Sequence, residues 1–142
     1  MKLIGFNFTK INAEKLNNLT QAPKVSNSID ISEIKEVKSK LFDSKENPIE
    51  ISFVYEIKYE PAFATLSFSG NLIFLLESKE SKDLIKKWKN KELSNDFKSS
   101  IFNIILKKTN IKAAQLEDEL NLPIHFQMPS IKIQEDSERK KN

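Results

Sequence analysis

The sequence predicts an α+β fold in which long strands come first and helices follow. The clearest observation is the alternation from Ile49 to Tyr59, where every second residue is large and apolar or aromatic. Successive strand side chains point to opposite faces, so this stretch is a long strand with one apolar face. A second long apolar run follows Pro61, and two segments with helical spacing come after it. The alternation predicts that Phe53, Tyr55 and Ile57 are buried, with Glu50, Ser52, Glu56 and Lys58 on the opposite, more polar face.

Two shorter strand candidates precede this pair. Leu3–Ile11 alternates, with its aromatic residues on one face. Asn27–Lys38 fits two templates, because Ile29 and Ile31 alternate as in a strand, whereas the apolar residues after Ile31 have helical spacing. We favour a strand there. Asn12–Ser28 shows no clear period and is expected to be an irregular excursion.

The second long run, Phe63–Leu76, changes character at Gly70. One face of the run is polar before this glycine, and both faces are apolar after it. A glycine inside a strand often marks a bulge or a close backbone approach. We interpret the two long runs as an antiparallel hairpin. Leu72–Leu76 should be covered on both faces, and the sequence leaves open whether one of them meets a sister subunit.

Two helices are expected in the second half. Ser81 is a candidate N-cap for a short helix to about Asn90, and Ser94 for a longer one of about 26 residues. Thr109–Ile111 is poor helix material and predicts a kink or break. The second helix should end before Pro123.

The 142 residues are expected to form a single domain at 1–133 and a disordered charged tail at 134–142. The chain has no cysteine, so disulfides and thiolate sites are excluded. Its first residues lack the apolar core of a signal peptide, and no apolar run is long enough to span a membrane. We therefore expect a cytoplasmic protein.

Known catalytic and cofactor motifs are missing. His125 is the single histidine, and we expect it to be structural or at the surface rather than part of a catalytic triad. A zinc site needs more Cys or His ligands, and a phosphate-binding loop needs clustered glycines. Glu117–Glu119 are three successive acids that we interpret as a solvated helix face. The sequence therefore predicts no enzyme, no metal site and no cofactor.

The positive charge is concentrated in Lys79–Lys98, which holds seven lysines against four acidic residues. Lysines can neutralise phosphates, so an alternative function is a nucleic-acid or ribosome-associated module that uses this basic helix. Base recognition favours arginine, however, and Arg139 is the one arginine of the chain. Trp88 shares its helical spacing with core residues. A nucleic-acid partner is therefore not favoured.

Three segments resemble the SecB chaperone family. Phe6–Asn17 (FNFTKINAEKLN) is similar to its first strand, and Ile49–Glu77 to its two long strands, including the step from polar to apolar after a glycine. Asp96–Ile124 resembles its main helix and the apolar segment that follows, with Leu120–Pro123 similar to a Leu-Asn-Leu-Ala-Pro run. The match spans most of the chain and is one of pattern and order. It looks closest to divergent SecB-like proteins, archaeal ones among them.

This resemblance implies a four-stranded antiparallel sheet with helices packed on one face. It also implies a homo-oligomer, a dimer or tetramer, that works as an ATP-independent protein-export chaperone. Such a holdase captures unfolded or exported polypeptides in apolar grooves. Pro123 and Pro129 interrupt the place of the family's second C-terminal helix. Coupling to an export motor is not carried over.

Six apolar residues are candidates for the peptide-binding groove because they lie beside turn residues or on an extended segment. The alternative is that they seal the core or a dimer interface. A further alternative function is a specific protein adaptor on the same fold. The six candidates are Leu41, Phe42, Leu122, Ile124, Phe126 and Met128.

Overall fold

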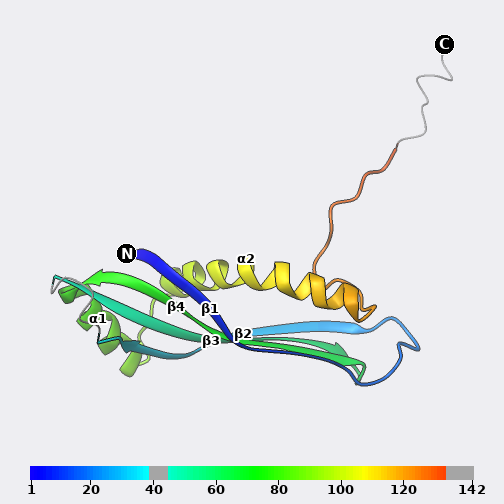
Figure 1. Cartoon of the computed structure of the whole chain (residues 1–142), viewed down its shortest axis with the longest axis horizontal. Helices are drawn as coiled ribbons and strands as arrows, with labels where there is room; N and C mark the ends of the chain where they lie inside the picture. The colour runs from blue at the N-terminus through cyan, green and yellow to red at the C-terminus, as the bar shows by residue number, and fades with distance from the viewer. Residues whose placement is uncertain (39–44, 134–142) are drawn as a thin grey trace, which may run out of the picture.

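The computed structural model describes residues 1–38 and 45–133. It confirms the α+β class, with four antiparallel strands followed by two helices (Figure 1). The predicted binding residues Leu41 and Phe42, and the predicted tail at 134–142, lie outside the described residues. The elements are β1 (Lys2–Lys15), β2 (Lys24–Glu36), β3 (Glu46–Glu60), β4 (Ala64–Glu77), α1 (Ser78–Lys89) and α2 (Asn95–Glu119).

The sheet order is β1-β4-β3-β2, so the two long strands form the centre and the two early strands form the edges. The predicted hairpin is confirmed, with β3 and β4 in register from Glu46 and Glu77 to Tyr59 and Ala64. β1 is longer than predicted, because its polar residues pair with β4 as far as Lys15 opposite Ala64. The predicted irregular excursion shrinks to residues 16–23. An edge strand buries little surface, so its pattern is weak and its length follows its partner.

The long strand at Ile49–Tyr59 has the predicted faces. Phe53 and Tyr55 are each 1% exposed and Ile57 is fully buried. On the opposite face Glu50, Ser52 and Glu56 are half-buried and Lys58 is exposed. This face alternation sets where the helices pack.

Gly70 marks the close backbone approach that the sequence predicted. It pairs with Phe8 beside a register shift in β1. A Cβ built on Gly70 would lie 2.2 Å from the Asn7 carbonyl oxygen and 2.8 Å from Cζ of Phe53. No side chain fits there, so glycine is required by space.

The N-terminus of α1 differs from the prediction. α1 begins at Ser78, directly after β4, and Glu77 occupies the N-cap position. Ser81 is buried inside the first turn, where its hydroxyl donates to the Ser78 carbonyl oxygen and lies 3.1 Å from Nδ2 of Asn47. The predicted Ser81 cap is therefore wrong. The Ser94 cap of α2 is confirmed by a 3.1 Å hydrogen bond from the Phe97 backbone N–H.

The predicted break in α2 does not occur, and the helix runs without interruption for 25 residues. The Thr109 hydroxyl is buried and donates to the Ile105 carbonyl oxygen at 2.8 Å. Packing therefore overrides the weak propensity of this segment. The fully buried residues of α2 repeat every four positions: Ile101, Ile105, Thr109, Ala113 and Glu117.

A four-residue repeat winds around a helix, because each step advances about 40° beyond one turn of 3.6 residues. The buried stripe of α2 thus rotates along its length and follows the twist of the sheet. The core forms two clusters along it. One combines Phe53 and Leu72 with Leu84 of α1 and the first half of α2, and the other combines Tyr55 and Tyr59 with the second half. Both helices therefore cover the same face of the sheet.

Candidate functional site

The candidate site is the extended segment that leaves α2 and projects from the body (Figure 1). α2 ends in a Schellman turn, in which the Leu122 N–H donates to the Glu117 carbonyl oxygen at 2.8 Å and the Asn121 N–H to Asp118 at 3.2 Å. Asn121 has φ 55°, a left-handed conformation that asparagine tolerates well. Pro123 then prevents any further helix.

A buried carboxylate fixes the start of this segment. The Glu117 side chain is fully buried, and it accepts hydrogen bonds from the Tyr59 hydroxyl and from the His125 backbone N–H at 3.0 Å. The His125 ring adds a contact of 2.8 Å from Nδ1 to Oε1 of Glu117. Three donors thus compensate the lost hydration of the carboxylate. The expected solvated face is wrong for Glu117, whereas Asp118 and Glu119 are exposed.

His125 completes the network from the segment itself. Its side chain is 2% exposed, and Nε2 lies 2.7 Å from Oδ1 of Asn110. Both ring nitrogens therefore lie within hydrogen-bond distance of a side-chain oxygen, Nδ1 near Glu117 and Nε2 near Asn110. The geometry gives His125 a structural role, as the sequence suggested, but its acidic partner comes from α2.

Two tyrosines on one face of β3 lie beside this network in different environments. Burial raises the pKa of Tyr59, and the hydrogen bond to the Glu117 carboxylate raises it further. Burial also raises the pKa of Tyr55, and the nearby Asn27 side chain offsets part of that rise. The geometry between the Tyr55 hydroxyl and Asn27 is not that of a normal hydrogen bond. The Tyr55 hydroxyl has no hydrogen-bond partner among the described residues.

This network can hold a segment in place but is poorly suited to catalysis. Its carboxylate and imidazole are buried and saturated by each other, so a substrate could not reach them. Within the ranges that the structure describes, no group of three or more His, Cys, Asp or Glu could bind a metal ion. We conclude that the network is a structural clamp between α2, β3 and the C-terminal segment.

The predicted binding residues on this segment differ in their exposure. Leu122 is 6% exposed and belongs to the core cluster of the second half of α2. Ile124 is half-buried. Phe126 and Met128 are 37% and 51% exposed. The Phe126 ring packs edge-on against the His125 ring, with the two ring centroids 4.9 Å apart. Further along, Ile131 and Ile133 are each 92% exposed.

The clamp was missed by sequence reasoning, although one signal was present. Glu117 lies four residues after Ala113 and so continues the four-residue stripe of buried positions. An acid on a buried stripe needs a partner. The single histidine, eight positions further on, was an available hydrogen-bond partner. Three successive acids are typical of a solvated helix face, and this pattern hides the one buried position among them.

No protein-family model matches the sequence, and no curated protein is detectably similar to it. Among solved structures, the fold is similar to that of the Mycobacterium tuberculosis Rv1957 SecB-like chaperone in complex with a ChAD peptide from the Rv1956 HigA1 antitoxin. The two share 13% sequence identity, with 93% of this chain and 92% of that chain covered, and the TM-score is 0.48. This is the family that the sequence pattern resembled.

Proposed function

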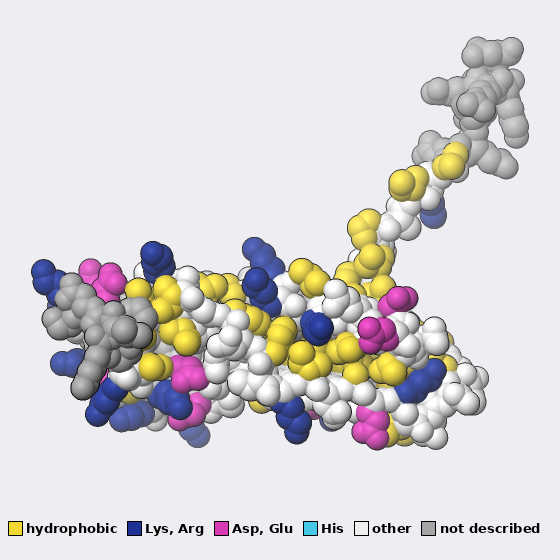
Figure 2. Space-filling view, viewed as in Figure 1, with side chains coloured by type: hydrophobic (Ala, Val, Ile, Leu, Met, Phe, Trp, Pro, Cys, Tyr) yellow, Lys and Arg dark blue, Asp and Glu magenta, His cyan; other side chains and the backbone are white. Residues whose placement is uncertain are grey.

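We propose that the chain is an ATP-independent holdase that binds unfolded polypeptides through the apolar segment after α2. The supporting observation is that this segment presents its apolar side chains to solvent while its start is clamped to the body. Figure 2 shows hydrophobic side chains along the projecting segment. The exposed residues are Phe126, Met128, Ile131 and Ile133.

The chemistry of the segment suits binding to many sequences. Exposed contiguous apolar surface is costly in a soluble protein and usually marks an interaction site. Met128 is flexible and adapts to irregular partners, and Phe126 supplies a large apolar face on a fixed base. An extended backbone can also pair with an extended client. No precise polar group is needed, which fits a holdase better than an enzyme.

We further propose that the chain assembles as a homo-oligomer and acts in the cytoplasm. Several apolar residues of α2 lie beside its buried stripe and are only partly covered, among them Phe102, Ile104 and Leu106. A sister subunit could cover them. Among the described residues, no helix is long and apolar enough to cross a membrane. Sedimentation at the mass of one chain would contradict the oligomer.

A light-scattering assay with a chemically unfolded client tests the holdase. The protein at equimolar subunits should suppress client aggregation without ATP. Replacing both Phe126 and Met128 by serine should reduce suppression several-fold. Ile4→Ser is the control. The exposed fraction of Ile4 is 39%, similar to the 37% of Phe126, but Ile4 lies on β1. It should leave suppression unchanged.

The holdase, the nucleic-acid module and the specific adaptor predict different binding results. No suppression at equimolar subunits, or equal loss in the Ile4 control, would overturn the holdase. Binding to generic RNA that weakens steeply with salt would instead favour the nucleic-acid module. Binding to a single fixed partner, without affinity for unfolded clients, would favour the specific adaptor.

A further inference from the structure

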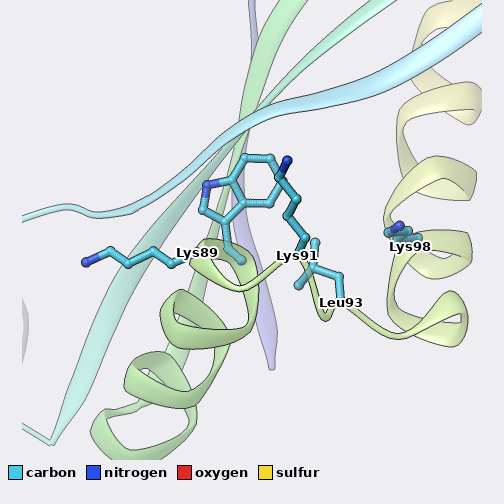
Figure 3. Close-up of a pocket in the computed structure, with 5 residues that line it drawn as sticks. Lys89, Lys91, Leu93 and Lys98 are labelled. Atoms are coloured by element: carbon cyan, nitrogen blue, oxygen red, sulfur yellow. The ribbon is translucent and has the colours of Figure 1, made fainter.

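A cleft opens where α1 ends and α2 begins, at the opposite end of α2 from the apolar segment. Its volume is about 520 Å³, within the range of small ligand sites. A 25-residue helix is about 37 Å long, so this cleft is far from the C-terminal segment. Figure 3 shows Lys91 and Leu93 on the turn between the helices, with Lys98 on the neighbouring part of α2. The lining residues are Trp88, Lys89, Lys91, Leu93 and Lys98.

The lining combines apolar surface with positive charge. Trp88 and Leu93 are partly buried against the core cluster of α1, so they form a fixed apolar floor. The three lysines are exposed, and no ion pair joins any of them to an acidic group of residues 1–38 or 45–133. On α1, by contrast, Lys87 forms an ion pair with Asp83 at 3.1 Å. The cleft therefore offers unneutralised cations beside an apolar surface.

Lys91 has a backbone conformation that is unusual for a lysine. Lys91 has φ 58° and follows the C-cap of α1, the position where glycine is the preferred residue. The turn is a Schellman motif, with the Glu92 N–H donating to the Lys87 carbonyl oxygen at 2.8 Å and the Lys91 N–H to Trp88 at 3.2 Å. A lysine here is conformationally unfavourable, and unlike asparagine it has no short side chain that compensates locally. Glycine would suit this backbone better but would not place a positive charge beside the cleft.

We propose that this cleft binds a short acidic segment of a partner protein, with a bulky apolar side chain on the Trp88–Leu93 floor and flanking carboxylates at the lysines. Lysines attract carboxylates and phosphates alike as point charges. One feature favours the peptide over nucleic acid. Trp88 is the one aromatic residue among the lining residues, and a single aromatic provides no track on which successive bases could stack.

The site is separate from the proposed holdase surface and serves a different ligand. Unfolded clients would meet apolar side chains on the C-terminal segment, whereas this cleft selects negative charge beside an apolar anchor. The electrostatic part of such binding weakens with salt, and the apolar part persists. Failure of aggregation suppression and failure of acidic-peptide binding are therefore independent results.

The test measures anisotropy of a fluorescein-labelled peptide, Glu-Glu-Leu-Phe-Asp-Glu, with the full-length chain. Trp88 is the one tryptophan, so a change in its intrinsic fluorescence also reports occupancy. Lys98→Glu should weaken binding at least tenfold. Lys107→Glu is the matched control, about 13 Å further along the same helix and also exposed, and should change affinity less than twofold.

Lys91→Gly separates binding from folding. Glycine suits the left-handed backbone, so this variant should be at least as resistant to urea as the parent while binding the peptide several-fold more weakly. Peptides with glutamine in place of the acids, or alanine in place of leucine and phenylalanine, should each lose most of the affinity. Equal effects of Lys98→Glu and Lys107→Glu, unchanged Trp88 fluorescence, or stronger binding of a generic RNA at this cleft would overturn the proposal.

Discussion

Two tyrosines on the same face of β3 should respond differently to the same substitution. Tyr59 and Tyr55 are both 1% exposed and lie four residues apart on the strand. The Tyr59 hydroxyl donates to the buried Glu117 carboxylate and lies close to the Pro123 carbonyl oxygen. The Tyr55 hydroxyl has no hydrogen-bond partner among the described residues. Tyrosine to phenylalanine removes one hydroxyl and leaves the ring packing intact.

The magnitude follows from what each hydroxyl does. A hydrogen bond to a charged group contributes about 1.5–3 kcal/mol, and Glu117 keeps its two His125 donors, so Tyr59→Phe should lower the free energy of unfolding by about 2 kcal/mol. A buried hydroxyl without a partner is unfavourable. Tyr55→Phe should therefore leave stability unchanged or raise it by up to about 1 kcal/mol.

Urea unfolding measures both variants, followed by Trp88 fluorescence and by circular dichroism. With a denaturant slope of about 2 kcal/mol/M, Tyr59→Phe should lower the midpoint by about 1 M. Protein concentration must be the same in every experiment, because an oligomer unfolds in a concentration-dependent way. Equal shifts for the two variants, or a larger loss for Tyr55→Phe, would show that the clamp does not stabilise the fold as described.

Three further predictions concern space, capping and pH. Gly70→Ala should lower the free energy of unfolding in urea by about 3 kcal/mol, because the new Cβ would meet the Asn7 carbonyl oxygen. Gly5→Ala should be tolerated, because its Cβ would stay at least 3.7 Å from its neighbours. Similar losses for the two variants would contradict the close approach at Gly70. Ser94→Ala should cost about 1 kcal/mol through the lost cap of α2, measured the same way, and no loss would contradict the cap. Because folding raises the pKa of both tyrosines, their stabilising contribution is complete below pH 10 and is lost as pH rises above it. Tyrosinate absorbance should therefore appear only with alkaline unfolding, and a titration near pH 10 in the folded protein would contradict their burial.

Local patterns in the sequence determined much of this structure. The alternation at Ile49–Tyr59 fixed a long strand and its buried face, and Ser94 fixed the start of α2. Gly70 marked the close approach of two strands. These features depend on periodicity, capping and space within a few residues, which a sequence displays directly. The candidate apolar segment was also visible, because prolines and alternating apolar residues exclude a helix there.

Only the tertiary structure decided the clamp and the cleft. Glu117 is buried where α2 packs on the sheet, and its partner Tyr59 lies 58 residues away in the sequence. Helix propensity predicted a break at Thr109, which packing removed. The lysines of the basic stretch look alike in sequence, but the turn after α1 brings Lys91 and Lys98 beside one apolar floor. Each of these outcomes depends on which surfaces distant segments present to each other, and no local pattern encodes that.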